Sequence, residues 1–318
     1  MEAILEVKNV SRSFRVGFWM KSVEIIHDVS FSVARNSIYG FLGANGAGKT
    51  TLISMIVGLR RPSSGQIRVS GFLSESEEAR AKVGYLPERP YFHEHLTGEN
   101  LLIYFGKLSG MSKKLILERI PIVLKQVGMS AARTIELRKY SKGMLQRLGI
   151  AQALIHDPEF LVLDEPMSGL DPVGRREIRE LILKLATEGK TIFFSTHVIP
   201  DAEAICDQVG IIQRGRLIAS GPLAELAKQG GPVRTEIIFS GISKSVIDAS
   251  DQIISLQELP DGIRCEIQSE EFADQLASKI LQQGGHIISL NLMRPSLESL
   301  FEKSDQSVTG LEFVRGLE

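Results

Sequence analysis

The feature that most constrains this chain is a glycine-rich octapeptide between a short apolar segment and a helical pattern. Residues 38–42 are apolar and end at the first glycine, and residues 50–59 have the residue pattern of a helix. The octapeptide fits G-x-x-x-x-G-K-[ST] and consists of Gly43, Ala44, Asn45, Gly46, Ala47, Gly48, Lys49 and Thr50. A strand, then this loop, then a helix is the context in which the pattern binds phosphate.

The residue types of this loop match the chemistry of a nucleotide phosphate. Glycines let backbone N–H groups converge on phosphate oxygens, and a helix that begins near Gly48 directs its positive end at the same anion. Lys49 supplies a mobile positive charge, and the Thr50 hydroxyl is a hard oxygen ligand suited to Mg²⁺. The alternative is a chance match in a chain with 29 glycines. Because both flanking segments fit, we predict that residues 43–50 and Thr51 bind a nucleotide.

Two carboxylates follow a second short apolar segment, residues 160–163. In open α/β sheets, ligands bind outside the carboxyl ends of the strands. We predict that Asp164 holds Mg²⁺, directly or through a water, and that Glu165 is the general base for the water that attacks the γ-phosphate. The alternative is that these acids cap the next helix. The phosphate loop upstream favours the metal site.

A third motif, Tyr140-Ser141-Lys142-Gly143-Met144-Leu145-Gln146-Arg147, lies before these acids. It resembles the LSGGQ signature of the ABC ATPase family, in the form typical of subunits paired with ABC-2-type export permeases, and residues 3–225 resemble that family's nucleotide-binding domain. The resemblance implies a head-to-tail dimer, homodimer or pseudo-dimer, in which Ser141, Lys142 and Gly143 contact the phosphate of ATP on the partner subunit. Without the resemblance, Ser141 is a helix N-cap.

Other residues match the family in the expected order. Asp171, in Ser168-Gly169-Leu170-Asp171, resembles the D-loop acid near the dimer seam, although it also fits a helix N-cap before Pro172. His197 follows the apolar residues 191–194 and resembles the switch histidine that hydrogen-bonds the γ-phosphate. The resemblance therefore assigns catalytic roles to Glu165, His197 and Lys49.

Two positions fit the family less well. Glu88 stands where the family usually has its Q-loop glutamine; it is a candidate Mg²⁺ ligand that adds negative charge beside phosphate, or else a solvated loop residue. Phe14 resembles the aromatic that stacks on adenine. Because residues 15–23 look like an insertion, Phe18 and Trp19 remain alternatives.

Composition limits the other functions that the chain can have. A net charge of −1 gives no reason to expect nucleic-acid binding. No apolar run approaches the ~20 residues of a membrane-spanning helix. The two cysteines fit no metal spacing, and His93 and His95 alone make a poor metal site. With the family resemblance, we expect a cytoplasmic protein, peripheral on the cytosolic face of the cell (inner) membrane, whose permease is a separate subunit.

The order of segments predicts an α/β fold with a largely parallel sheet and helices on both faces. The family resemblance implies a P-loop NTPase of ABC type, with a mixed sheet core, an antiparallel β subdomain and a helical subdomain. We place the nucleotide-binding domain at residues 1–229 and its helical subdomain at about 90–158, with breaks near Gly110, Pro121 and Gly128. Helices are also expected at 172–188 and 199–207.

A composition shift at residues 229–232 suggests a linker. Beyond it, residues 232–303 are expected to form a small α+β, ferredoxin-like accessory domain that helps dimerisation or regulation, followed by a tail at 304–318. Its expected elements are strands at 234–239, 252–257, 262–268 and 286–293, helices at 243–249 and 270–283, and an amphipathic segment at 296–302.

The function that these observations favour is an ATP-hydrolysing motor subunit that couples Mg-ATP hydrolysis to export by a separate permease. One alternative is a soluble ABC protein acting on the ribosome or DNA, and another is a nucleotide-sensing module without transport. The sequence does not identify the cargo.

Overall fold

The computed structural model describes residues 2–17, 21–229, 234–243, 252–293 and 297. The chain divides into two compact units, Met1–Leu223 and Ala224–Glu318. The boundary between the two units lies before the linker that was predicted at residues 229–232. A helix, α8 (Leu223–Gln229), spans the residues between the boundary and that linker.

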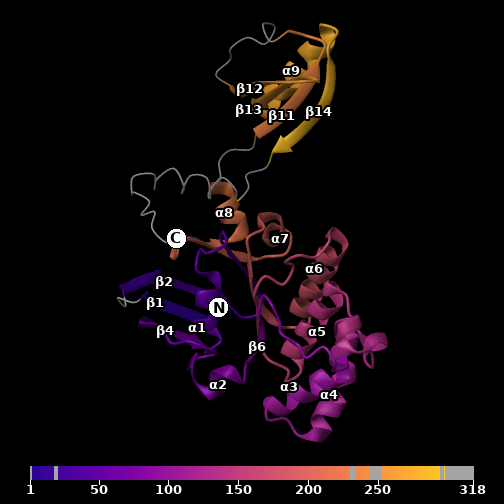
Figure 1. Ribbon diagram of the computed structural model, residues 1–318. Helices are drawn as coiled ribbons and strands as arrows, with labels where there is room; N and C mark the ends of the chain where they lie inside the picture. The colour runs from indigo at the N-terminus through magenta and orange to yellow at the C-terminus, as the bar shows by residue number, and fades with distance from the viewer. Residues whose placement is uncertain (1, 18–20, 230–233, 244–251, 294–296, 298–318) are drawn as a thin grey trace. The chain divides into compact units, whose positions relative to one another are not determined.

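The first unit contains an antiparallel sheet with the strand order β2-β1-β4-β5. Its strands are β1 (Ala3–Val16), β2 (Lys21–Ala34), β4 (Ser64–Val69) and β5 (Phe72–Leu73). Figure 1 shows β1, β2 and β4 on one side of the unit, in indigo and violet. This sheet is the antiparallel β subdomain that the family resemblance implies.

The second sheet of this unit has six strands in the order β10-β9-β3-β8-β7-β6, and the pairs from β9 to β6 are parallel. Its strands are β3 (Ile38–Leu42), β6 (Val83–Leu86), β7 (Phe160–Leu163), β8 (Thr191–Thr196), β9 (Gln208–Gln213) and β10 (Arg216–Pro222). Every residue of β3, β7 and β8 is buried, as expected for parallel strands covered on both faces. Since β3, β8 and β7 are neighbours, the loops that follow them meet at one edge.

The helices of this unit either cover the six-stranded sheet or form the helical subdomain. They are α1 (Lys49–Ile56), α2 (Glu77–Arg80), α3 (Gly98–Leu108), α4 (Lys113–Gln126), α5 (Lys142–Leu154), α6 (Pro172–Thr187) and α7 (Ile199–Glu203), with 3₁₀ turns at Ser130–Ala132 and Leu137–Lys139. Figure 1 shows α3, α4 and α5 together, on the side of the unit away from β1 and β2. Within the described residues, none of the helices has the length and apolarity needed to cross a bilayer.

The predicted helix break at Pro121 is wrong, because α4 continues through this residue. A proline in a helix removes the hydrogen bond to the carbonyl four residues earlier, here that of Leu117. Both Pro121 and Leu117 lie on the exposed face, so water can satisfy that carbonyl. The breaks at Gly110 and Gly128 are confirmed, and each glycine has a positive φ just after a helix.

Two other predicted helices end earlier than expected. The helix expected at 50–59 ends at Ile56. The helix expected at 199–207 ends at Glu203, because Asp207 already pairs with β3. The Asp207 N–H donates to the Ile38 carbonyl, and the Ile38 N–H donates to the Asp207 carboxylate at 2.8 Å.

The second unit has an antiparallel sheet in the order β12-β13-β11-β14, packed against one helix. Its elements are β11 (Arg234–Ser240), β12 (Ile253–Leu259), β13 (Gly262–Ile267), α9 (Glu270–Gln282) and β14 (His286–Met293). This is the strand order of the ferredoxin-like pattern. The predicted helix at 243–249, the amphipathic segment at 296–302 and the tail lie outside the described residues, apart from Ser243 and Leu297.

Candidate active site

The glycine-rich loop between β3 and α1 requires glycine at particular positions. Gly46 and Gly48 have φ angles of 80° and 107°, which residues with a Cβ rarely adopt. Gly43 approaches β9 so closely that an added Cβ would lie 2.6 Å from the Ile212 carbonyl oxygen. The backbone of the loop therefore depends on three glycines of the motif.

Helix α1 begins directly after this loop. Its N-cap is Gly48, and no side chain accepts a hydrogen bond from its first turn. The first N–H groups of a helix have no partners within the helix. They and the positive end of the helix dipole are thus available to an anion.

Lys49 lies at the centre of the site and is only 6% exposed. Its Nζ donates to the Gly43 carbonyl at 2.6 Å and to the Ala44 carbonyl at 3.3 Å. It also lies 3.2 Å from Oε1 of Glu165, which is buried as well. The charge of Lys49 is therefore held inside the loop by two carbonyls and a carboxylate.

Glu165 connects Lys49 to His197. Its carboxylate oxygens lie 3.0 and 3.1 Å from Nδ1 of His197, at the end of β8. Its φ is 48°, a left-handed conformation that costs a residue with a side chain roughly 1–2 kcal/mol. The turn that follows is closed by the Ser168 N–H, which donates to the Glu165 carbonyl at 3.0 Å.

Asp164 is fully buried, and one of its oxygens is available to a ligand. Oδ1 accepts a hydrogen bond of 2.5 Å from the Ser195 hydroxyl. Oδ2 has no partner at normal hydrogen-bond geometry among the described residues. Burial raises the pKa of Asp164, and the charges of Glu165 and Glu88 raise it further, whereas hydrogen bonding to Ser195 and Thr50 opposes the rise.

The alternative that the two acids cap the following helix is wrong. The next helix, α6, begins at Pro172, and its N-cap is Asp171, whose Oδ1 accepts from the Gly174 N–H at 2.8 Å. The Asp164 and Glu165 carboxylates instead face the region around Lys49 and Ser195.

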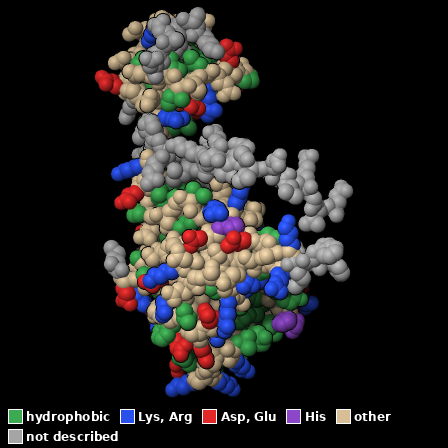
Figure 2. All heavy atoms as spheres, turned by 90° about the vertical axis from the view of Figure 1, so that its left-hand side faces the viewer, with side chains coloured by type: hydrophobic (Ala, Val, Ile, Leu, Met, Phe, Trp, Pro, Cys, Tyr) green, Lys and Arg blue, Asp and Glu red, His purple; other side chains and the backbone are tan. Residues whose placement is uncertain are grey.

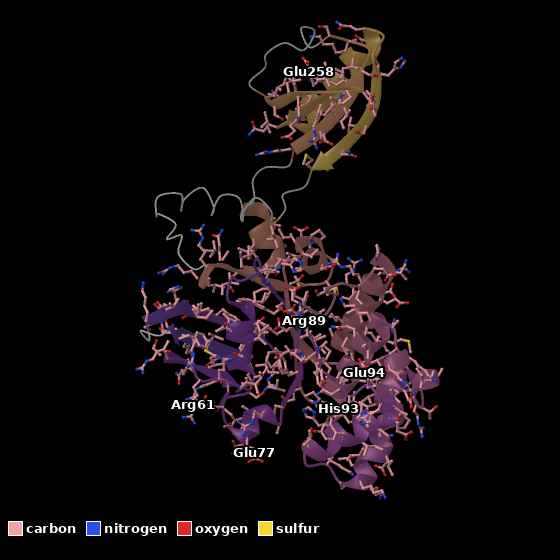
Figure 3. All side chains as sticks on the ribbon, viewed as in Figure 1. Arg61, Glu77, Arg89, His93, Glu94 and Glu258 are labelled. Atoms are coloured by element: carbon pink, nitrogen blue, oxygen red, sulfur yellow. The ribbon has the colours of Figure 1, made fainter. Side chains whose placement is uncertain are left out.

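Three side chains fit a magnesium ion. Thr50 and Asp164 are close enough for the Thr50 side chain to affect the Asp164 pKa, and Glu88 acts on the same carboxylate through its charge. All three offer hard oxygen ligands, and Oδ2 of Asp164 has no partner at normal hydrogen-bond geometry among the described residues. Glu88 is exposed, and its carboxylate lies 3.8 Å from Nε of Arg89, which Figure 3 labels.

A cavity of about 300 Å³ unites most of the predicted residues. It is lined by Ile25, Ala44, Asn45, Gly46, Gly48, Lys49, Thr50, Thr51, Glu88, Glu165, Ser168 and His197. Sequence reasoning missed Ile25 and Ser168 as lining residues. Ser168 lies within the D-loop match, which was a usable signal, whereas no motif marks Ile25.

The remaining predicted residues lie outside the lining of this cavity. The guanidinium carbons of Arg12 and Arg60 lie 4.8 and 5.3 Å from the centroid of the Phe14 ring. The contact of Phe14 with adenine stays a prediction. The alternatives Phe18 and Trp19 are outside the described residues.

The signature residues form the start of α5. Ser141 is its N-cap, and its hydroxyl accepts from the Met144 N–H at 3.2 Å. Lys142 and Gly143 begin the helix, with Lys142 Nζ close to Gly169 of the D-loop. The N-cap interpretations of Ser141 and Asp171 are confirmed, and their contact with a partner's nucleotide stays a prediction.

Other groups with potential chemistry show no metal site. His93, which Figure 3 labels, and His95 lie on the loop before α3, not on a strand, and their ring centroids are 5.7 Å apart. Across the residues placed by the structure, no three His, Cys, Asp or Glu side chains gather in a group that could hold a metal ion. Figure 2 shows acidic and basic side chains interspersed on the face that it presents.

Comparison with known proteins gives consistent relatives. A family model described as ABC transporter matches residues 26–168. An uncharacterized ABC transporter ATP-binding protein of Synechocystis is 40% identical over 301 residues, covering 94% of this chain and 83% of that protein. The bacitracin transport ATP-binding protein BcrA of Bacillus licheniformis is 37% identical over 287 residues, covering 89% and 92%.

A solved structure of an ATP-binding subunit of an ABC transporter is similar at a TM-score of 0.61 and 32% identity, covering 71% of this chain and 92% of that one. These relatives confirm the family resemblance and the predicted fold class. The activity of this family is the binding and hydrolysis of ATP. The chain belongs to the ATP-binding subunits of ABC transporters.

Proposed function

We propose that this chain is the motor subunit of an ABC exporter, which binds Mg-ATP between two ATPase subunits and drives a separate membrane permease. The observation that carries the proposal is the meeting of three loops. The segments after the neighbouring strands β3, β7 and β8 place Lys49 Nζ and His197 Nδ1 each within 3.2 Å of the Glu165 carboxylate.

ATP binding begins with an exchange of partners at Lys49. In the described structure, this ammonium group pairs with Glu165 and two loop carbonyls. A triphosphate in the cavity brings more negative charge and meets the free N–H groups at the start of α1. Lys49 then pairs with phosphate and leaves the Glu165 carboxylate free.

Hydrolysis uses the carboxylate released in this way. Glu165 orients a water and accepts its proton as general base. His197, at the cavity wall, hydrogen-bonds the γ-phosphate through its imidazole. Thr50 and Asp164, with Glu88 as a further ligand, hold Mg²⁺, which when bound neutralises charge on the phosphates.

A second ATPase subunit completes the site in this proposal. Ser141 and Asp171 cap the N-termini of α5 and α6, but neither residue lines the cavity of its own chain. A helix N-terminus suits phosphate, so the start of α5 fits the nucleotide of a second copy. A dimeric ATP-binding cassette with bound ADP and Pi shares this fold, at 22% identity and a TM-score of 0.61 over 69% of this chain and 98% of that one.

Export by a separate permease is supported by the names of relatives. One is a bacitracin transport protein, and another, from Bacillus subtilis, is a linearmycin resistance protein with 31% identity over 94% of this chain and 97% of its own length. We place the subunit on the cytosolic face of the cell membrane, bound to that permease.

The test of the catalytic assignment is the variant Glu165→Gln. It keeps the shape of the side chain but removes the base, so turnover should fall more than ~10²-fold while ATP still binds. Phosphate release with Mg-ATP and titration with a fluorescent ATP analogue give the two quantities. Near-normal turnover in the variant would reject Glu165 as the base, and a wild-type chain that binds ATP without turnover would favour the sensing alternative.

The accessory unit after residue 229 has its own core of β-strand and α9 residues, and the residues that line the ATP cavity all belong to the first unit. We propose that it helps dimerisation or regulation. Residues 1–229 alone should therefore fold and bind ATP but dimerise more weakly or lose control of turnover. Sedimentation and phosphate release compare the two forms, and equal dimerisation and equal turnover would remove this role.

A further inference from the structure

We propose that Ser195 is a positioning residue for ATP hydrolysis, which holds both acids of the site in their working orientation. This inference rests on the roles proposed above for Asp164 and Glu165. It concerns a residue that no sequence motif marked and that does not itself line the ATP cavity.

The geometry that points to Ser195 is a pair of hydrogen bonds made by one hydroxyl. Its Oγ donates to Oδ1 of Asp164 at 2.5 Å and accepts from the Glu165 N–H at 2.9 Å. Ser195 is fully buried near the end of β8, the strand next to β7. A single side chain thus ties the two acids after β7 to the strand that carries His197 two residues later.

Glu165 needs this support because its backbone is left-handed. A φ of 48° is uncommon for a residue with a long side chain and persists only where the surroundings hold it. Ser195 anchors the N–H of this peptide, and the Ser168 N–H anchors its carbonyl at 3.0 Å. With the first anchor removed, a buried N–H is left unpaired and the backbone is free to relax. The Glu165 carboxylate would then leave its place between Lys49 and His197.

Asp164 depends on the same hydroxyl in a different way. Its Oδ1 accepts from Ser195, while Oδ2 has no partner at normal hydrogen-bond geometry among the described residues. The Ser195 hydroxyl therefore fixes the rotation of the carboxylate and leaves Oδ2 as the oxygen presented to a metal. The loss of this bond should weaken the effect of Mg²⁺ on ATP affinity, but not the affinity of the phosphate loop measured without Mg²⁺.

A control in the same strand separates a catalytic role of Ser195 from a purely structural one. Thr191, at the other end of β8, is also buried, and its Oγ1 accepts from the Asn36 N–H at 2.9 Å. It contacts neither acid by a hydrogen bond and does not line the cavity. Thr191→Val removes a buried hydroxyl of β8 without touching the site.

The experiment compares Ser195→Ala, Ser195→Thr, Ser195→Val and Thr191→Val in the full chain. We measure kcat and KM for Mg-ATP, the ATP affinity with and without Mg²⁺, and the melting temperature. Ser195→Ala and Ser195→Val should lose about 10- to 100-fold in kcat, as expected for misplaced catalytic groups, with unchanged affinity for metal-free ATP. Ser195→Thr, which keeps the hydroxyl, should retain most of kcat, and Thr191→Val should lower only the melting temperature.

Wild-type kcat in Ser195→Ala would overturn the proposal, and so would an equal fall of kcat in Thr191→Val at an equal loss of stability. The Ser195→Thr and Ser195→Val variants both add a methyl group at a buried position. If that group does not fit, both variants lose stability alike, and the comparison of Ser195→Ala with Thr191→Val then decides whether the hydroxyl acts on catalysis. Failure of the proposed function is seen separately, as a wild-type chain without Mg-ATP turnover or a fully active Glu165→Gln variant.

Discussion

At the scale of single residues, Lys49, Glu165 and His197 form one connected group in the ATP cavity. Lys49 and Glu165 are both buried, so removing either one takes away the charge that balances the other. In the proposed mechanism, the ion pair holds the site together before ATP binds, and phosphate then replaces Glu165 as the partner of Lys49. The stability of the Glu165→Gln variant must be measured beside its turnover, because the substitution also breaks this pair.

The glycines of the loop give a prediction about stability. At Gly46, where φ is 80°, an added Cβ meets nothing within 4 Å, whereas at Gly48 it lies 2.7 Å from Cδ1 of buried Ile26. Gly46→Ala should therefore cost only the backbone strain of about 1–2 kcal/mol. Gly48→Ala should cost more, because it adds overpacking of about 1–3 kcal/mol. Urea unfolding without nucleotide measures both, and equal losses would contradict this account.

Sequence reasoning could find residues whose chemistry depends on a local motif. Lys49 and Thr50 belong to a pattern that is complete within eight residues, and Glu165 directly follows a recognisable strand. Ser195 and Ile25 were missed because their roles arise from pairing between distant segments. A serine near the end of an apolar strand has no pattern that distinguishes it from an ordinary buried hydroxyl.

At the scale of elements, Glu159, the residue just before β7, forms ion pairs with two basic residues. Its carboxylate pairs with Lys82, just before β6, and with Arg35 at 2.5 Å, in the turn after β2. Hydrogen bonds from Lys82 and then Arg35 lower the pKa of Glu159 below its ordinary value of 4.5. The carboxylate form is therefore favoured by folding.

Stability should depend on pH through this residue. Because the folded pKa is lowered, the contribution of Glu159 is complete above pH 4.5 and is lost as the pH falls through the folded pKa. Since the group is partly exposed, Glu159→Gln should cost a few tenths to about 1 kcal/mol at pH 7. The difference should shrink in acid. Guanidinium unfolding at pH 7 and in acid checks this, with the exposed Glu180→Gln as control, and a difference that grows in acid would refute it.

The predicted limits of the helices and strands were most accurate where a single sequence signal determines them. The limits of β3 and β7 are as expected, because each is a fully buried run that ends at Gly43 or Asp164. Pro121 misled the prediction, because local propensity marks it as a break while tertiary packing of Ile120, Val123 and Leu124 keeps α4 continuous.

At the scale of the whole molecule, the chain has two units with separate hydrophobic cores. The α/β class of the first unit and the ferredoxin-like pattern of the second were predictable from the succession of elements. The order β10-β9-β3-β8-β7-β6 was not, because it depends on pairing between strands that are far apart in the sequence. That order is what brings the loops after β3, β7 and β8 together.

The central claim is that ATP is bound between two copies, by the phosphate loop of one and the start of α5 of the other. The most direct measurement is the mass of the Glu165→Gln variant by sedimentation, with and without Mg-ATP, beside the same variant with Ser141→Arg. We predict a monomer that becomes a dimer with ATP, and a Ser141→Arg form that binds ATP but stays monomeric. ATP binding that leaves the first variant monomeric, or dimers that form equally well with Ser141→Arg, would contradict the account.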